Sequence, residues 1–220
     1  MICRSDPSSF QLGSKRLIIL DIDGTLLDAR PSWTSAAISL CDDFKLNIFL
    51  NLDIVSTMCA LGAQPLITLL GNQAGRCLSD EFWHRVYEVF DDEIVVHFND
   101  LFFRHWNMSA EVVCLTNKMP THLENILSAV GHRWGVRDIV CPNGVARKPS
   151  SAGLDYIIEK YRANRLDAAF VGDTRVDHEA ALHAGLDYVH CSYGYDINFI
   201  PERAVATLSR PAQLGPLWGV

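Results

Sequence analysis

Three short apolar segments, each followed at once by polar residues, constrain the fold of this chain more than any other feature. An unbroken apolar run of this length is typical of a strand buried on both faces, and an abrupt change to polar residues is typical of the end where such a strand opens into a loop. A further short strand is expected over residues 187–191. The segments, each with the residue that follows it, are Leu17–Leu20 with Asp21, Val112–Leu115 with Thr116, and Ala168–Val171 with Gly172.

Helical patterns separate these expected strands. One has a capping box formed by Thr121 and Glu124 and a stop at Gly131; a second covers residues 154–161, and a third covers about 176–184. Strands that alternate with helices predict an α/β fold with a parallel sheet and helices on both faces, and ligands of such folds bind outside the carboxyl ends of the strands. The polar ends of the three strands are therefore expected to converge on one site.

The segment from residue 30 to residue 106 breaks this alternation. Its apolar spacing predicts mostly helix, over residues 32–44, about 53–70, and from 80 onwards. We therefore predict that this segment is an inserted α-helical domain.

The remaining residues, 1–29 and 107–220, form the predicted core domain, and residues 1–16 are expected to be a partly ordered tail. Two parallel strands need a crossover connection of a dozen or more residues. Because few residues separate the inserted segment from the second expected strand, we predict that residues 94–106 form the crossover helix. On this interpretation the last helix of the segment belongs to the core, and the inserted domain covers about residues 30–92.

Length and charge narrow the classes of partner. The 220 residues allow one full domain with a modest insertion. The 19 Lys and Arg residues against 26 Asp and Glu residues give a formal charge of −7, which provides no field to hold a nucleic-acid backbone or an anionic lipid surface. We therefore expect no nucleic acid and no membrane among the partners.

The cysteines and the apolar stretches indicate a location. The seven cysteines are odd in number and contain no Cys-x-x-Cys pair, so they are expected to be reduced, largely buried thiols in a cytoplasmic protein. The most apolar stretch, residues 44–70, is interrupted by polar residues well before the 18 or so apolar residues of a membrane-spanning helix. Residues 1–16 lack the apolar centre of a secretory signal.

The loop after the first expected strand pairs two carboxylates. Asp21 and Asp23 are two residues apart, and Gly24 allows the chain to turn sharply there. In such a pair one carboxylate can attack an electrophile while the other handles the proton. This loop is therefore the first candidate for a catalytic centre.

Four segments, in order, resemble the motifs of the haloacid dehalogenase superfamily. The segment Asp21–Asp28 resembles the first motif, Thr116–Lys118 the second, Lys148–Pro149 the third and Gly172–Asp177 the fourth. The long interval between the first two is similar to that of the branch with a helical C1 cap, and within this branch the chain most resembles phosphoglycolate phosphatases. The resemblance implies a Rossmann-like parallel sheet core flanked by helices, with an inserted α-helical cap domain.

The resemblance implies a role in phosphoryl transfer for five residues. Asp21 would be the nucleophile that forms an aspartyl-phosphate, and Asp23 would protonate the leaving oxygen and later deprotonate the attacking water. Thr116, the backbone N–H groups near Asn117, and Lys148 would bind the phosphate oxygens. Lys148 would also neutralise the charge of Asp21.

The resemblance also implies a Mg²⁺ cofactor. Its ligands would be the carboxylates of Asp21 and Asp173 and the backbone carbonyl of Asp23. Asp177 would not bind the ion directly but would support it by orienting these ligands or through a water molecule. Any one of these residues alone is more often a turn, surface or capping residue, but four motifs in order outweigh that interpretation. Lys118 is expected either to reach the substrate or to be a solvated surface side chain.

The predicted activity is therefore that of a Mg²⁺-dependent phosphatase acting on small phosphorylated metabolites, with phosphoglycolate as the named substrate. The presence of Asp23 argues against the dehalogenases and the phosphonate-cleaving members of the superfamily, which lack the second aspartate. A phosphosugar mutase of the β-phosphoglucomutase type keeps all four motifs and is the alternative, as is a non-catalytic binding or regulatory member. The expected partner is a small phosphorylated metabolite, and the chain is expected to be a monomer or a homodimer.

Overall fold

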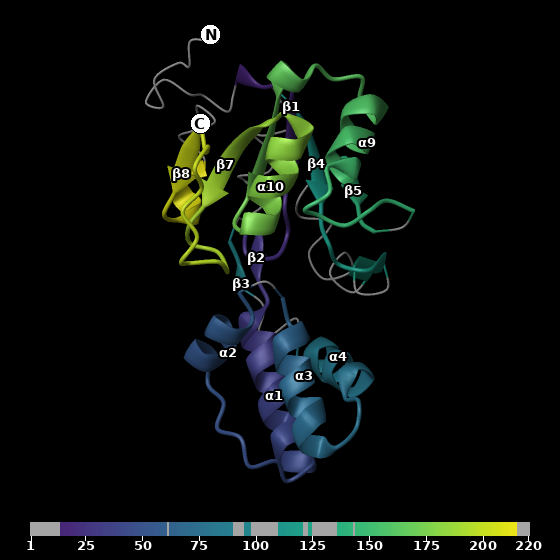
Figure 1. The fold of residues 1–220 in the computed structure, drawn as a ribbon, viewed down its shortest axis with the longest axis vertical. Helices are drawn as coiled ribbons and strands as arrows, with labels where there is room; N and C mark the ends of the chain where they lie inside the picture. Colours follow the sequence, from purple (N-terminus) through teal and green to yellow (C-terminus); the bar gives the residue numbers. More distant parts are fainter. Residues whose placement is uncertain are drawn as a thin grey trace. The chain divides into compact units, whose positions relative to one another are not determined.

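The chain folds into two compact units, of which the first combines residues 1–26 and 97–220 and the second comprises residues 27–96 (Figure 1). The structure is a computed structural model. It describes residues 14–60, 62–89, 95–97, 110–120, 123–124, 136–142 and 144–214. Most of the predicted tail and most of the predicted helix over residues 121–131 lie outside these described residues.

The first unit is built on a six-stranded sheet in the order β5-β4-β1-β6-β7-β8, with every neighbouring pair parallel. This confirms the α/β class and the four strands expected from the sequence. The other two strands, β5 and β8, lie at the edges. The strands are β1 (Leu17–Leu20), β4 (Glu111–Leu115), β5 (Asp138–Val140), β6 (Ala168–Gly172), β7 (Asp187–Cys191) and β8 (Ala206–Leu208).

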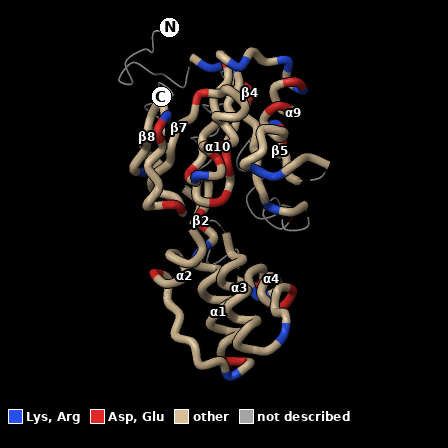
Figure 2. Tube along the Cα trace, viewed as in Figure 1, with Lys and Arg blue, Asp and Glu red and all other residues tan. Residues whose placement is uncertain are grey.

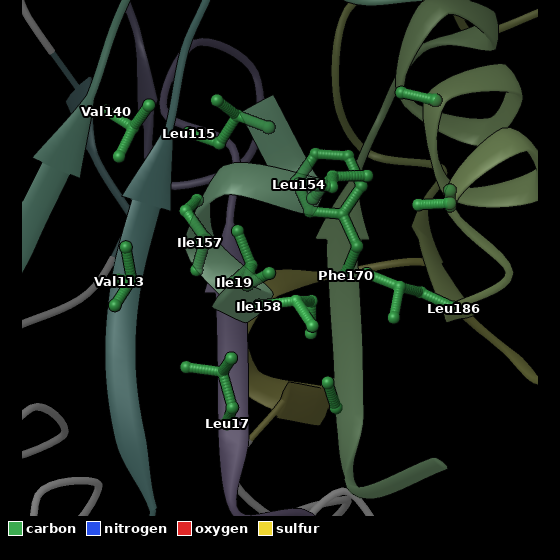
Figure 3. Close-up of a cluster of buried hydrophobic side chains, with 14 of the residues drawn as sticks. Leu17, Ile19, Val113, Leu115, Val140, Leu154, Ile157, Ile158, Phe170 and Leu186 are labelled. Carbon is green, nitrogen blue, oxygen red and sulfur yellow. The ribbon is translucent and has the colours of Figure 1, made fainter. Parts of the chain in front are cut away.

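Two helices, α9 (Ala152–Lys160) and α10 (Arg175–Ala184), pack on the sheet through a common apolar cluster. Figure 3 shows Leu17 and Ile19 of β1 and Phe170 of β6 close to residues of α9. All four residues of β1 are buried, as expected of a strand covered on both faces. The apolar spacing thus located both helices correctly.

Two short 3₁₀ helices flank strands of the sheet in the part of the first unit that is described. The helix η4 (Arg165–Asp167) leads into β6, and η5 (Pro211–Gln213) follows β8. Asn164 caps η4, because its side chain accepts a hydrogen bond from the backbone N–H of Leu166 at 3.0 Å.

The described residues of the second unit form four helices and a two-stranded antiparallel sheet, β2 with β3. The helix predicted over residues 53–70 is in fact two helices. Pro65 explains the break, because a proline inside a helix would clash with the carbonyl four residues earlier, whereas it is well tolerated in the first turn of the second helix. The elements are β2 (Leu27–Asp28), α1 (Arg30–Asp43), α2 (Leu52–Met58), α3 (Gln64–Ala74), α4 (Ser79–Glu88) and β3 (Val95–Val96).

The crossover helix predicted over residues 94–106 is wrong where the structure describes that segment. Val95–Val96 is strand β3, which pairs with Leu27–Asp28, and β-branched side chains favour a strand over a helix. Residues 98–106 lie outside the described residues.

Charged residues of both signs are distributed over both units in the part of the chain that is described (Figure 2). Among those same residues, no helix has the length and apolar character needed to cross a bilayer.

Candidate active site

The carboxyl ends of the three central strands bring the predicted site residues together. In the register of the sheet, Leu20 at the end of β1 lies beside Cys114 of β4 and Val171 of β6. Because the strands are parallel, the loops that follow them leave the same edge of the sheet. Asp21 therefore leaves β1 at the edge where Thr116 follows β4.

A buried chain of charges runs from Asp21 through Lys148 to Asp177. The Lys148 ammonium donates to Oδ1 of Asp21 at 2.5 Å and to Oδ1 of Asp177 at 2.6 Å. Its third donor faces the backbone carbonyl of Leu115 at 3.3 Å. All three charged side chains are buried. Removing Lys148 would leave two buried carboxylates without a compensating charge, which is costly.

Burial and crowding set the protonation behaviour of these groups. Burial, reinforced by Asp177, raises the pKa of Asp21 to about 7, although Lys148 opposes the shift. Burial, together with Asp177 and Asp21, also raises the pKa of Asp173 well above its usual value. Burial alone would lower the pKa of Lys148, but the two carboxylates that contact it raise this pKa above its ordinary value. The cluster thus holds more negative charge than Lys148 balances.

Asp173 is held by the loops around it. Its carboxylate accepts hydrogen bonds from the Thr25 hydroxyl at 3.2 Å and from the backbone N–H of Tyr195 at 2.6 Å. A Cβ at Gly24 or at Gly194 would overlap this carboxylate, and Gly24 has a φ of +85°. Glycine at these two positions therefore gives Asp173 room next to Asp21.

Asp177 closes the first turn of α10. Its Oδ2 accepts from the backbone N–H of Thr174 at 3.0 Å and from the Thr174 hydroxyl at 2.6 Å, and Thr174 in turn caps the helix. Its other oxygen accepts from Lys148. Both oxygens are therefore occupied, which fixes the carboxylate in place.

The Asn117 side chain makes two hydrogen bonds to the backbone of Lys148. Its side-chain amide donates to the backbone carbonyl of Lys148 at 2.9 Å and accepts from the backbone N–H of Lys148 at 2.8 Å. The side chain thus links the loop after β4 to the loop that carries Lys148. The phosphate contact predicted for the backbone N–H groups near Asn117 stays a prediction, as does the one assigned to Thr116.

For Lys118, the sequence left open whether the side chain reaches the site or is solvated at the surface. Its ammonium lies 3.2 Å from Oδ1 of Asp23, and its side chain is 8% exposed. The interpretation as a solvated surface lysine is therefore wrong. The signal available in the sequence was only its position directly after the second motif.

The acidic residues fit a hard divalent cation. Carboxylate oxygens of Asp21, Asp173 and Asp177 lie within 4.8 Å of one another, and all three side chains are buried. Buried carboxylates with raised pKa values gain from a nearby cation, and an all-oxygen donor set suits Mg²⁺. Three of the four residues predicted to hold the metal thus lie together, and their binding of Mg²⁺ stays a prediction.

Comparison with known proteins connects this arrangement to a family. Among curated proteins, the chain is 28% identical over 196 residues to the phosphoglycolate phosphatase of Pseudomonas syringae pv. syringae (strain B728a), covering 82% of this chain and 71% of that protein. It is also 28% identical over 198 residues to the phosphoglycolate phosphatase of Pasteurella multocida (strain Pm70), covering 83% of this chain and 88% of that protein.

Solved structures show the same fold. The crystal structure of a predicted phosphoglycolate phosphatase from Haemophilus somnus 129pt superposes with a TM-score of 0.74 at 23% identity, covering 91% of this chain and 96% of that one. The family model of the haloacid dehalogenase-like hydrolases matches residues 18–191, which include all four motifs. With its nucleophile candidate, lysine and acidic cluster at the carboxyl edge of the parallel sheet, the chain belongs to the haloacid dehalogenase-like hydrolase family.

Proposed function

We propose that this chain is a Mg²⁺-dependent phosphatase that hydrolyses small phosphate monoesters of the phosphoglycolate kind through an aspartyl-phosphate. The observation that carries the proposal is the buried contact between Asp21 and Lys148, with Asp173 and Asp177 beside it and Asp23 two residues along the chain. The names of the curated relatives support the phosphate ester as substrate.

In the first step, a carboxylate oxygen of Asp21 attacks phosphorus. A bond forms between Asp21 and phosphorus, and the bond from phosphorus to the leaving oxygen breaks. Asp23 gives its proton to that oxygen as the bond breaks. Lys148 keeps Asp21 oriented and offsets its negative charge as the phosphoryl group approaches.

In the second step, a water molecule attacks the phosphorus of the aspartyl-phosphate. Asp23 accepts a proton from this water, the bond between Asp21 and phosphorus breaks, and inorganic phosphate and the free Asp21 carboxylate are released. The Thr116 hydroxyl and the backbone N–H of Asn117 stabilise the charge on the phosphate oxygens in both steps.

Asp21 and Asp173 would hold the metal directly, and Asp177 would support it. When bound, Mg²⁺ supplies positive charge that offsets the repulsion between these carboxylates and the phosphate. The raised pKa values of Asp21 and Asp173 show how unfavourable their negative charges are without such an ion.

We further propose that the second unit acts as the cap domain of this enzyme and that the protein works in the cytoplasm. Insertion of residues 27–96 between β1 and β4 supports the first proposal. The second is supported by the described cysteines, which are all free thiols and mostly buried.

Phosphate release from a panel of phosphorylated metabolites tests the proposed function. The panel contains 2-phosphoglycolate, β-glucose 1-phosphate and p-nitrophenyl phosphate, each with Mg²⁺ or with EDTA. We expect Mg²⁺-dependent release by the wild type and a loss of at least about 10⁴-fold in kcat for Asp21→Asn, because the amide cannot form the covalent intermediate.

The matched control for this test is Asp187→Asn, which alters an aspartate that pairs with Lys15 at the other end of the sheet. It should keep near-normal turnover. Release from no member of the panel by folded wild-type protein would overturn the hydrolase proposal, and conversion of the glucose phosphate without release of phosphate would favour the mutase.

A further inference from the structure

The contact between Lys118 and Asp23 places a second ammonium at the reacting end of the site. Lys118 Nζ lies 3.2 Å from Asp23 Oδ1, with side-chain exposures of 8% and 20% respectively. The backbone of Lys118 is also fixed, because its N–H donates to the hydroxyl of Thr116 at 3.1 Å. The backbone of Lys118 is therefore anchored in the loop after β4, and its ammonium reaches Asp23.

The two lysines of the site are engaged differently. The three N–H donors of Lys148 are directed to Asp21, to Asp177 and to the carbonyl of Leu115. Lys148 thus serves the nucleophile side of the cluster. Lys118 brings its positive charge to Asp23, where the leaving group departs, and the structure gives that charge no role in the phosphoryl-transfer steps derived above.

The chemistry of the leaving group decides what such a charge would recognise. To deliver its proton, Asp23 must lie within hydrogen-bond distance of the leaving oxygen, roughly 2.6–3.2 Å. In the phosphate ester of a short 2-hydroxy acid, the carboxylate carbon is only two covalent bonds from this oxygen. An ammonium in contact with Asp23 is therefore within reach of that carboxylate, and burial strengthens the attraction because little water screens it.

We propose that Lys118 binds the carboxylate of the leaving group and so selects phosphate esters of short 2-hydroxy acids, such as 2-phosphoglycolate, over uncharged esters of the same size. This assignment rests on the proposed phosphatase function and names the residue that sets its substrate class. The competing role is that Lys118 only positions Asp23. The two roles differ in their consequence for substrates that have no carboxylate.

The kinetic test compares two substrates on the full-length protein. These are 2-phosphoglycolate and ethyl phosphate, in which a methyl group replaces the carboxylate. For Lys118→Met we expect the ratio of kcat/KM on 2-phosphoglycolate to kcat/KM on ethyl phosphate to fall by about 10- to 100-fold, as for the loss of a charged hydrogen bond to the carboxylate. Lys118→Arg, which keeps the charge, should retain most of the preference.

A binding test removes any dependence on turnover. The probes are 3-phosphonopropionate and propylphosphonate, which differ only in the carboxylate and cannot be hydrolysed at the phosphorus–carbon bond. Calorimetry in the presence of Mg²⁺ should show that the wild type binds 3-phosphonopropionate about 10-fold or more tightly than propylphosphonate. Lys118→Met should bind the two alike. The matched control is Lys160→Met, which removes a lysine that is far from Lys118 in the sequence and is paired with Asp138. This variant should show the same difference in affinity between the two probes as the wild type.

The outcomes separate this inference from the function on which it rests. Equal loss on both substrates by Lys118→Met would show that Lys118 only positions Asp23, and an unchanged preference would show that it has no part in selection; either result overturns the inference. If the wild type hydrolyses no ester at all, the proposed function fails, and the binding test still decides whether Lys118 recognises the carboxylate.

Discussion

At the scale of single residues, the two hydrogen bonds between the Asn117 side chain and the Lys148 backbone connect parts of the chain that are 31 positions apart. The motifs identify both residues, but no pattern in the sequence shows that one holds the other, because this contact depends on how two loops approach in space. The contact of Lys118 with Asp23 could not be predicted either, because it also depends on how two loops approach in space. Motif residues that follow the strands directly, such as Asp21 and Thr116, could be placed from chain order alone.

The Asn117 link leads to a prediction about positioning. Asn117→Ala should leave the Lys148 backbone without two partners and let its ammonium move away from Asp21. We expect kcat to fall by about 10- to 100-fold with a much smaller change in KM, along with a loss of about 1–2 kcal/mol in the free energy of unfolding. Steady-state kinetics and urea unfolding check both numbers.

The control for this prediction is Asn164→Ala, which removes a helix-capping hydrogen bond before β6, at the opposite end of that strand. It should cost similar stability while leaving kcat unchanged. If both variants lower kcat by the same factor, Asn117 acts on general stability and not on Lys148.

At the scale of secondary structure, the apolar runs located the central strands because those strands are buried on both faces. The edge strands β5 and β8 were not predicted, because they are three residues long and only partly buried.

The first turn of α10 combines a local and a functional role, since Asp177 both caps the helix and holds Lys148. His178, one residue further on, is buried against the ring of Tyr188.

Close packing at the end of the sheet gives a prediction for Gly194. A Cβ there would overlap the Asp173 carboxylate, so Gly194→Ala must displace a residue that would hold the metal. We expect the Mg²⁺ concentration for half-maximal activity to rise by about 10-fold or more, as found when the groups that orient a metal ligand are disturbed. Titration of activity with Mg²⁺ measures this value.

Gly153→Ala in α9 is the matched control. Its added Cβ would lie 2.7 Å from the end of the flexible Leu115 side chain, which can move, and alanine favours the helix. This variant should keep the Mg²⁺ requirement of the wild type. An unchanged requirement in Gly194→Ala as well would contradict the importance of the glycine.

At the scale of the whole molecule, the crowded carboxylates of the site make the free energy of unfolding depend on pH and on a bound metal ion. The pKa of Asp21 is raised to about 7 in the folded chain, chiefly by burial, against an ordinary value of 3.8. The folded state therefore holds a proton that the unfolded state has lost, and the contribution of Asp21 to stability falls as the pH rises from about 4 to about 7. A bound cation would reverse this loss.

We therefore expect that, in EDTA, Asp21→Asn unfolds at a higher temperature than the wild type at pH 8, and that the difference shrinks towards pH 5 as Asp21 becomes protonated. The gain at pH 8 should be about 2–4 kcal/mol. Added Mg²⁺ should raise the Tm of the wild type more at pH 8 than at pH 5, and should raise that of Asp21→Asn much less.

Differential scanning calorimetry at the two pH values, with Asp187→Asn as the control, measures these shifts. A difference between wild type and Asp21→Asn that does not vary with pH would contradict the raised pKa of Asp21.

The position of β1 between β4 and β6 also has a consequence for how the protein is made. On the ribosome, Asp21 emerges well before Lys148, Asp173 and Asp177, which follow it by more than a hundred positions. The environment of Asp21, the proposed nucleophile, is assembled only when β6 and α10 dock beside β1. A nascent or truncated chain that lacks β6 and α10 therefore carries the proposed nucleophile without the residues that surround it in the fold.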